Sequence, residues 1–211
     1  MVSKQEQRSE ETKRSILQAA GELFASRGYD GVTMREIAKE AKCSHTTIYI
    51  YFKDKEALLQ QLALPSIELL QIEMSEIKKQ IDQPEEQLIR MSMLFIRLCL
   101  AQRSMYNLFF NIQSERVDEP NPILAVNEAR NGLFVTLKSS MAAFTKLTME
   151  DERCLLFTRI YYFAIHGIVA TYQHSHESVE QLMERLTKTF EMTFEVMLEG
   201  ILSQLSKGAN E

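Results

Sequence analysis

The 211-residue chain is 45% hydrophobic and carries a formal net charge of −5. This length suffices for one large core, or for a small domain beside a larger one. Seven glycines, four prolines and no tryptophan favour helices over sheet, and no segment alternates with period two for long enough to indicate a strand. We therefore expect an all-α fold.

Three cysteines, Cys43, Cys99 and Cys154, are odd in number and widely separated. This pattern argues against a disulfide framework or a zinc cluster and suits a reducing cytoplasm. The N-terminus is charged throughout, which argues against a signal peptide. The apolar stretch from Ile160 to Tyr172 falls short of the roughly 20 residues that a membrane span needs. We expect a soluble, cytoplasmic protein with no membrane partner.

The first expected helix begins near the N-terminus, where Ser9 can serve as its N-cap. Ile16, Leu17, Ala20, Leu23 and Phe24 then form one apolar stripe. Gly28 is a suitable C-terminal stop. This helix is expected to support the segment that follows it.

Two short helices are expected next. Thr33 and Glu36 form a Thr-x-x-Glu capping box, which predicts a helix start. After a turn at Lys42-Cys43, Ser44 is a second N-cap that opens a helix over residues 45–51. Two short helices joined by a tight turn are typical of helix-turn-helix, in which the second helix lies in the DNA major groove.

The polar side chains of this segment are the candidate DNA contacts. The first turn of the second helix carries the side chains that reach base edges, and neighbouring hydroxyl and cationic groups hold phosphates. We expect base contacts from Ser44, His45, Thr46 and Thr47, and phosphate contacts from Thr33, Arg35, Tyr49, Tyr51 and Lys55. The alternative is that the Tyr-x-Tyr-Phe run serves only in packing.

The negative charge is concentrated after residue 60, outside the segment expected to bind DNA. The first 60 residues hold 10 Lys and Arg against 9 Asp and Glu, and the remainder holds 14 against 20. Phosphate contact depends on the local cationic face rather than on the net charge of the whole chain.

The helix-turn-helix segment and the helices on either side of it share a wider pattern of residues. Its positions are Ile16, Leu17, Ala20, Leu23, Phe24, Gly28, Thr33, Ile37, Ala38, Ala41, Ser44, Thr47, Ile48, Tyr49, Phe52, Lys55 and Leu58. The pattern resembles the DNA-binding domain of the tetracycline-repressor (TetR) family of bacterial transcriptional regulators. The resemblance covers Ile16 to Leu59. The family often has Gly-Val where this chain has Lys42-Cys43, and often Gly at Thr46; these departures affect the expected operator more than the fold.

Beyond residue 60 the chain predicts further helices. Asp54 caps one that meets Pro65, which is either a bend or a boundary between two helices. Others are expected from Pro84, over 105–112, over 133–144, from Thr148 with Asp151, and from Ser178 with Gln181; residues 113–122 are expected to form a loop.

The last two expected helices carry wide apolar stripes. Such helices could pair with their copies in a second subunit as a four-helix bundle, which the resemblance also implies, or could simply form the internal core. The candidate dimer residues are Ala164, Gly167, Ile168, Phe190, Phe194, Met197 and Ile201.

The helical remainder also holds most of the methionine and phenylalanine. Methionine adapts to irregular shapes, so these residues either line an effector pocket or fill the core. The candidate pocket residues are Met91, Phe95, Met105, Phe109, Phe134, Met141, Phe157, Tyr161 and His166.

No motif predicts catalysis, a metal site or a cofactor. We expect a DNA-binding domain over residues 1–60 and an effector-binding and dimerisation domain over residues 61–211. The expected function is a homodimeric transcriptional regulator, a repressor released from a pseudo-palindromic DNA operator by a small apolar or aromatic effector. The alternative is a DNA-tethered scaffold whose C-terminal domain binds another protein without small-molecule control.

Overall fold

The computed structural model describes residues 4–110 and 114–208, without the side chains of Ser104, Met105, Asn107 and Leu108. All the regular elements in these residues are helices, which confirms the all-α prediction. They are α1 (Lys4–Arg27), α2 (Met34–Glu40), α3 (His45–Tyr51), α4 (Lys55–Gln80), α5 (Pro84–Ala101), α6 (Arg103–Phe110), α7 (Ala125–Thr145), α8 (Glu152–Tyr172) and α9 (Val179–Gly208).

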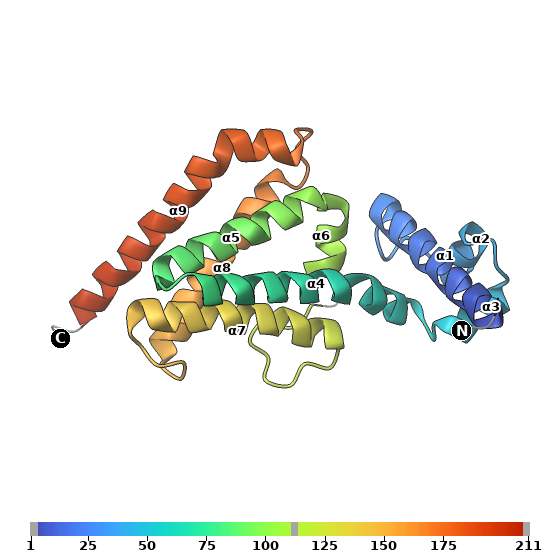
Figure 1. The fold of residues 1–211 in the computed structure, drawn as a ribbon, viewed down its shortest axis with the longest axis horizontal. Coiled ribbons are helices and arrows are strands. Elements are labelled where there is room, and N and C mark those ends of the chain that lie inside the picture. The colour runs from blue at the N-terminus through green and yellow to red at the C-terminus, as the bar shows by residue number, and fades with distance from the viewer. Residues whose placement is uncertain (1–3, 111–113, 209–211) are drawn as a thin grey trace.

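The helices form a small N-terminal unit (α1–α3) at one end of the molecule and a larger C-terminal bundle (α4–α9), as Figure 1 shows. In the bundle, α4 packs on α5 and α7, while α5 also contacts α8 and α9. The short helix α6 contacts α4, α5 and α1, so it touches both parts of the molecule.

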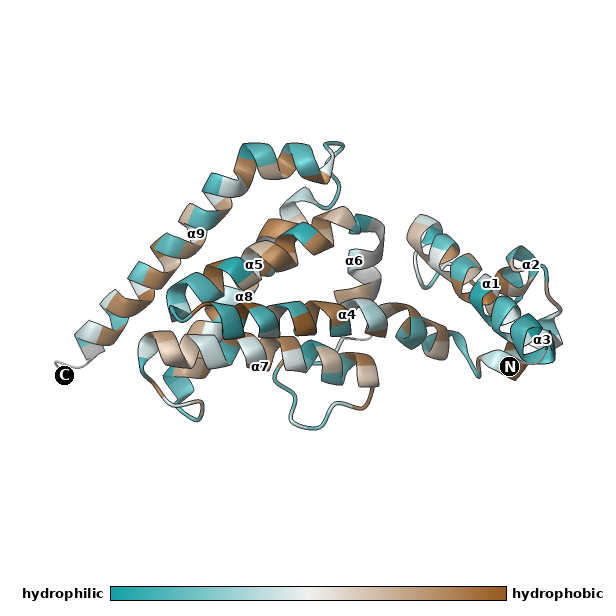
Figure 2. Cartoon of the chain, in the orientation of Figure 1, coloured by the Kyte–Doolittle hydropathy of each residue, from teal (hydrophilic) through white to brown (hydrophobic). Residues whose placement is uncertain are grey.

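The core of the N-terminal unit comes from the apolar stripe predicted for α1. Ile16, Ile37 and Ile48 are fully buried and join the three helices. Figure 2 shows hydrophilic and hydrophobic residues on the helices of this unit, and on α3 the residues His45, Thr46 and Tyr49 are exposed. The helices α2 and α3 therefore pack on a hydrophobic core, while one face of α3 remains exposed to solvent.

Glycine shapes the connection between α1 and α2. Gly28 has a φ of +76°, the left-handed conformation that favours glycine at the end of a helix. A Cβ added to Gly31 would lie 2.8 Å from the carbonyl oxygen of Arg27, which is closer than real Cβ contacts. Both residues therefore allow the chain to turn tightly into the capping box of α2.

Two expected N-caps are wrong. The helix α1 already includes Lys4, so Ser9 lies inside it; the flanking Lys, Gln, Glu and Arg residues are good helix formers and extend the helix past Ser9. The N-cap of α8 is Asp151, whose carboxylate accepts from the Arg153 N–H at 2.8 Å, rather than Thr148. By contrast, Ser178 and Gln181 make the reciprocal capping bonds expected at the start of α9.

The helix α4 continues through Pro65 and crosses the domain boundary expected at residue 60. Pro65 is therefore inside a helix rather than between two. Proline cannot donate the interior hydrogen bond and commonly bends a helix, and Figure 1 shows α4 bending where it leaves the bundle. One helix thus carries the chain from the N-terminal unit into the bundle.

Candidate functional site

The start of α3 is built by Ser44 and Thr47. Ser44 Oγ accepts from the Thr47 N–H at 2.9 Å and lies 2.7 Å from Thr47 Oγ1. Ile48, one turn further on, is fully buried and fixes which face of α3 points inward. The two hydroxyls expected to read DNA are therefore engaged in capping the helix, although each retains hydrogen-bonding capacity.

His45 and Thr46 lie beside this cap and are exposed. The His45 ring meets the Tyr49 ring edge-on, with centroids 5.1 Å apart and an interplanar angle of 81°. Tyr49 is 47% exposed and Ile50 is 75% exposed, so the outward face of α3 combines polar groups with apolar surface. Imidazole, hydroxyl and methyl groups are all able to contact base edges in a major groove.

Exposed cations surround this face. Arg35, Lys39, Lys42 and Lys53 are solvent-exposed, and within the described part of the chain none of them forms an ion pair. Lys42 has a φ of 55°, the left-handed conformation, at the position where the family often has glycine. A lysine is thus held in the left-handed conformation at some conformational cost, and its ammonium lies on the surface.

Thr33 is engaged in the predicted capping box, whereas Lys55 has internal partners that the sequence did not predict. Thr33 Oγ1 donates to Glu36 Oε2 at 2.7 Å within the capping box. The Lys55 ammonium donates to the carbonyl oxygens of Tyr29 and Val32 at 2.8 and 3.0 Å and lies 4.2 Å from the centroid of the Tyr29 ring. Most of the bonding capacity of Lys55 thus holds the turn before α2, and its expected phosphate contact stays a prediction.

Tyr51 is half-buried at the edge of the α3 surface. It lines a surface hollow of about 350 Å³ together with Lys13, Lys53 and Gln60. This position leaves the phenolic group beside two lysines, which is compatible with the expected phosphate contact.

Four of the expected pocket residues meet in the middle of the bundle. Met91, Phe95, Phe134 and His166 line a narrow cavity of about 20 Å³, which we call the chamber. Its remaining lining residues, absent from the sequence prediction, are Met74, Leu133, Leu137, Tyr162 and Ile165.

The other expected pocket residues do not line this cavity. Phe109, Met141, Phe157 and Tyr161 are buried elsewhere in the core, and Tyr161 stacks on Phe194 with ring centroids 5.1 Å apart. Their placement in the pocket is therefore corrected, because their helical positions direct them into packing. The Met105 side chain lies outside the described residues.

His166 lies at one end of the chamber, among aromatic rings. Its Nδ1 is 2.8 Å from the hydroxyl of Tyr106, and its ring stacks on Tyr162 with centroids 4.1 Å apart. Burial lowers the pKa of His166 to about 4, so the ring is neutral near pH 7. Its Nε2 is buried and has no hydrogen-bond partner in the part of the chain that the structure describes.

A wider cavity of about 710 Å³, which we call the vestibule, lies next to the chamber and shares Tyr162 and His166 with it. Arg130 lines the vestibule, is buried, and donates to the Phe109 carbonyl and to Asn127 Oδ1, both at 2.6 Å. Desolvation lowers the pKa of Arg130 to about 10, which still leaves it charged near pH 7. Its spacing of three residues from Leu133 on the apolar face of α7 was a signal that could have identified it from the sequence.

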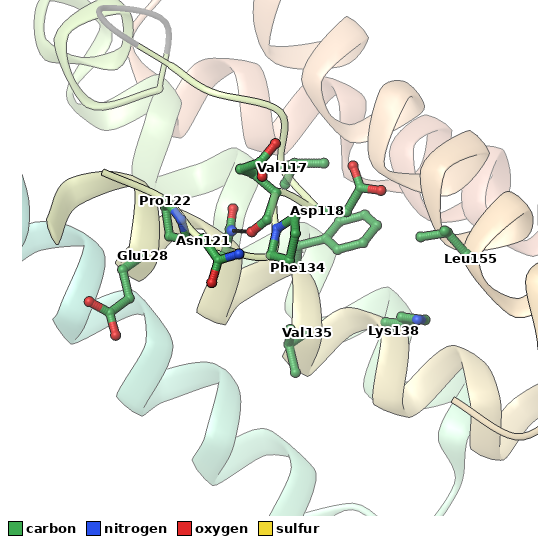
Figure 3. Close-up of a pocket in the computed structure, with 12 residues that line it drawn as sticks. Val117, Asp118, Asn121, Pro122, Glu128, Phe134, Val135, Lys138 and Leu155 are labelled. Atoms are coloured by element: carbon green, nitrogen blue, oxygen red, sulfur yellow. Dashed lines mark hydrogen bonds between the residues drawn. The ribbon is translucent and has the colours of Figure 1, made fainter. Parts of the chain in front are cut away.

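Val117, Asp118 and Asn131 line both the vestibule and an outer groove of about 670 Å³. Figure 3 shows the loop residues Val117, Asp118 and Pro122 near Phe134 of α7, with Lys138 and Leu155 further along the groove. Asp118, which lines both cavities, pairs with Arg159 of α8.

Helix α8 carries an apolar stripe that faces solvent in the single chain. Leu156, Ile160 and Phe163 are 52%, 43% and 63% exposed, and Gly167 continues the stripe. The apolar stretch expected from the sequence begins at Ile160, but the whole of α8 is long and apolar enough to cross a membrane, with 33% of its most apolar stretch buried. One such helix is weak support for a membrane span, because a helix at a subunit interface has the same composition.

A similar stripe runs along α9, where Met192 and Val196 are 48% and 58% exposed. A Cβ added to Gly167 or Gly200 would have nothing within 4 Å, so packing within one chain does not require these glycines. Glycine inside a helix is destabilising by roughly 0.5–1 kcal/mol relative to alanine, and close approach of another backbone is a common reason for it.

The expected dimer residues divide into two groups. Gly167 lies on the exposed stripe, with Ala164, Ile168 and Met197 partly exposed beside it. Phe190, Phe194 and Ile201 are only 2%, 0% and 5% exposed, so they belong to the core of the subunit. Their assignment to the dimer interface is corrected, because the α9 stripe read from the sequence is the inward one.

Capped α2, a tight turn and capped α3, supported by α1, define a helix-turn-helix DNA-binding domain. Residues 16–62 match the sequence profile described as "Bacterial regulatory proteins, tetR family". This domain belongs to the TetR family, as the resemblance predicted.

Individual relatives support the same assignment. The chain is 49% identical over 49 residues to the HTH-type transcriptional regulator YuxN of Bacillus subtilis, covering 23% of this chain and 17% of YuxN. It is 37% identical over 97 residues to the regulator HbdR of Aromatoleum, covering 44% of this chain and 41% of HbdR. The matched stretches thus span less than half the length of these curated relatives.

Solved structures match over most of the fold. The fatty acid degradation regulator FadR of Bacillus halodurans has a TM-score of 0.62 at 18% identity, covering 84% of this chain and 97% of FadR. The ketosteroid transcriptional regulator KstR2 of Mycobacterium tuberculosis has a TM-score of 0.64 at 16% identity, covering 89% and 93% of the two chains. At these identities the likeness concerns the fold.

Proposed function

We propose that the protein is a cytoplasmic, homodimeric transcriptional regulator that binds a pseudo-palindromic DNA operator and is released from it by a small effector. The observation that carries the DNA-binding part is the outward face of α3, where His45 and Thr46 are exposed beside the cap formed by Ser44 and Thr47. The exposed cations Arg35, Lys39 and Lys42 supply the electrostatic surroundings that phosphate binding needs.

The exposed stripes of α8 and α9 support the homodimer. Together they offer an apolar surface with two glycines that packing within the chain does not require. A second copy of the chain presents the same two helices, so a two-fold arrangement would cover all four stripes in one interface. Two reading helices related by this two-fold axis would bind two half-sites of opposite orientation.

The chamber supports control by an effector. It lies between α4, α5, α7 and α8 and offers only about 20 Å³, so a bound molecule must push these helices apart. Because α4 also enters the N-terminal unit, such a movement would change the spacing of the two reading helices in a dimer. An effector that binds the displaced conformation more tightly would release DNA, which is the action of an inducer on a repressor.

Two structural neighbours, a fatty acid degradation regulator and a ketosteroid transcriptional regulator, agree with an apolar effector. The scaffold alternative, without a small molecule, leaves unexplained the buried nitrogen of His166, which has no partner among the described residues and lies at the chamber wall.

The test of DNA recognition compares two substitutions on the operator selected by the parent protein. His45→Ala should cost roughly 1–3 kcal/mol on that site and relax the preference at particular base pairs. Arg35→Ala should weaken binding to all sequences about equally and lower the salt slope by about 1. An unchanged base preference in His45→Ala would contradict the placement of α3 in the groove.

A further inference from the structure

The strongest unassigned feature of the bundle is the buried nitrogen of His166. Tyr106 makes its only hydrogen bond within the described residues to His166 Nδ1. A buried phenol without an acceptor is costly, so the hydroxyl donates to Nδ1, and the neutral ring then carries its proton on Nε2. Among the described residues His166 therefore has an N–H donor without a partner, and its ring lines both the chamber and the vestibule.

The polar surroundings of this donor favour an anion. Three arginines, Arg116, Arg130 and Arg159, line the vestibule, against the carboxylates of Glu115 and Asp118. Glu115 accepts from the Ile123 N–H at 3.2 Å, and Asp118 pairs with both Arg116 and Arg159, so it offsets the charge of these two arginines. Arg130 is the buried arginine of the three.

Arg130 brings a positive charge to the cavity that His166 also lines. Both side chains line the vestibule, and Tyr162 interacts with each of them. The Tyr162 ring packs on the His166 ring. Burial raises the pKa of the Tyr162 hydroxyl to about 12, and the charge of Arg130 opposes this rise. The contacts of Arg130 with Phe109 and Asn127 fix its guanidinium at the cavity wall. A fixed cation beside an N–H donor is a suitable receptor for a carboxylate.

The chamber on the other side of His166 is apolar. Met74, Met91, Leu133 and Leu137 line it, and methionine side chains change shape more readily than branched ones. A ligand with its charged end in the vestibule would therefore direct an apolar chain or ring between these residues.

We propose that the effector is an amphipathic carboxylic acid, with its carboxylate held by Arg130 and the His166 Nε2–H and its apolar part inserted into the chamber. This inference rests on the proposed function only in treating the ligand as the effector. The aromatic rings around His166 offer a competing possibility, a cationic ligand held by cation–π contacts, which the test addresses directly.

The test is calorimetric titration of the full chain, without DNA, using octanoate, 1-octanol and octylamine below their aggregation concentrations. Octanoate should bind roughly tenfold or more tightly than octanol, because a charge-assisted contact is lost in the alcohol. Octylamine should bind more weakly still. Equal or tighter binding of octanol or octylamine would overturn the proposal, and so would a folded protein that binds no octanoate.

Variants locate the site. His166→Phe and Arg130→Gln should each weaken octanoate binding roughly tenfold and leave octanol binding nearly unchanged. Arg116→Gln is the matched control, since Arg116 lines the vestibule but is 60% exposed, and should bind octanoate as the parent does.

Because Arg130 also anchors α7, Leu137→Phe provides an independent variant that fills the chamber and leaves the polar end intact. It should abolish binding of both octanoate and octanol while unfolding cooperatively like the parent. Undiminished octanoate binding in both His166→Phe and Leu137→Phe would contradict the site. Failure of these titrations is separable from failure of the regulator proposal, which would show as the absence of a selected DNA sequence.

Discussion

The ammonium of Lys55 joins three parts of the N-terminal unit. It lies at the start of α4, donates to the carbonyls of Tyr29 and Val32 in the turn between α1 and α2, and covers the Tyr29 ring. Tyr29 itself packs against Phe24, with ring centroids 5.2 Å apart. Lys55 therefore positions the helix-turn-helix pair relative to α4.

We predict that Lys55→Met lowers the free energy of unfolding by about 1–3 kcal/mol, because two partly buried carbonyls lose a charged donor while the alkyl stem is kept. Urea unfolding measures this loss. Lys53→Met is the matched control, since Lys53 is exposed and should change stability by less than about 0.5 kcal/mol. Equal stability of the two variants would show that the Lys55 contacts contribute little.

His166 gives the protein a specific sensitivity to acid. Its pKa is lowered to about 4 by burial, whereas the unfolded chain has the ordinary value of 6.5. Between these values the unfolded state binds a proton that the folded ring excludes, so stability falls as pH falls through this window. The neighbouring titratable groups Tyr106, Tyr162 and Cys99 all have pKa values raised by burial, so they stay neutral there, and Arg130 stays charged.

We predict that His166→Phe loses roughly 2 kcal/mol less stability than the parent between about pH 7 and about pH 4.5. The comparison needs urea unfolding of both proteins at both pH values. Carboxylates such as Glu36, whose pKa is lowered to about 2 mainly by the hydrogen bond from Thr33, contribute equally to both proteins. Parallel losses of stability would mean that His166 is not held neutral in the folded state.

At this scale, sequence analysis succeeded where the interactions are local. The capping of Thr33 and Ser44 depends on residues three positions away, so their spacing alone predicts it. The partners of Lys55 are backbone carbonyls 23 and 26 residues away, and an acceptor that every residue possesses leaves no pattern in the sequence.

The helices α8 and α9 each have one apolar face turned into the subunit and another turned to solvent. Phe194 is fully buried, whereas Val196, two residues further along α9, is 58% exposed. This neighbouring pair separates the core from the proposed dimer interface.

We predict that Val196→Glu folds like the parent but is monomeric, because dimerisation would bury an unpaired carboxylate at a cost of several kcal/mol. Sedimentation analysis measures the oligomeric state, and helical circular dichroism confirms the fold. Phe194→Glu, the matched variant, should instead fail to fold. A dimeric Val196→Glu would place the interface on another surface.

Pro65 lies on the helix that connects the two parts of the chain. It is exposed and contributes to neither the DNA surface nor the chamber. Alanine at this position restores an interior hydrogen bond and should straighten or stiffen α4. We predict that Pro65→Ala keeps the operator preference and the dimer but changes the factor by which effector weakens DNA binding.

The measurement for Pro65→Ala is operator affinity with and without saturating effector, in the variant and in the parent. Coupling between two sites typically amounts to 1–3 kcal/mol, so a change is measurable. The same ratio in both proteins would mean that the signal travels by another route, for which α6 is the candidate, since it contacts α1 and carries Tyr106.

Apolar periodicity predicted which segments form helices. It predicted less well which face of each helix is buried and where each helix ends. On α9 the sequence showed one long stripe, but its inward and outward sides can be distinguished only when α5 and α8 are in place. Likewise, Pro65 could be a bend or a boundary, and packing of the following turns on α7 decides for a continuous helix.

The whole molecule consists of the N-terminal unit and the C-terminal bundle, which meet where α1 contacts α4 and α6. Gly21 of α1 lies against α4, where an added Cβ would be 3.6 Å from Leu62, so the two parts are in close contact. The acidic excess beyond residue 60 lies in the bundle, away from the exposed face of α3 (Figure 1). This distribution reconciles a net charge of −5 with binding to DNA.

The architecture was predictable from composition and from the capped helix pair, because both depend on near neighbours along the chain. The cavity was predictable only in part. Met91, Phe95, Phe134 and His166 were expected to line a pocket, but Met74 and Tyr162 come from other turns of α4 and α8, and their convergence depends on how the helices cross.

The most direct test of the central claim is selection of bound sequences from random double-stranded DNA, followed by determination of the number of chains on the selected site. A two-fold dimer with one α3 per half-site should select an inverted repeat whose half-site centres lie about one or more helical turns apart, bound by chains in multiples of two. Enrichment of no sequence, or of a single unrepeated site occupied by one chain, would contradict the account.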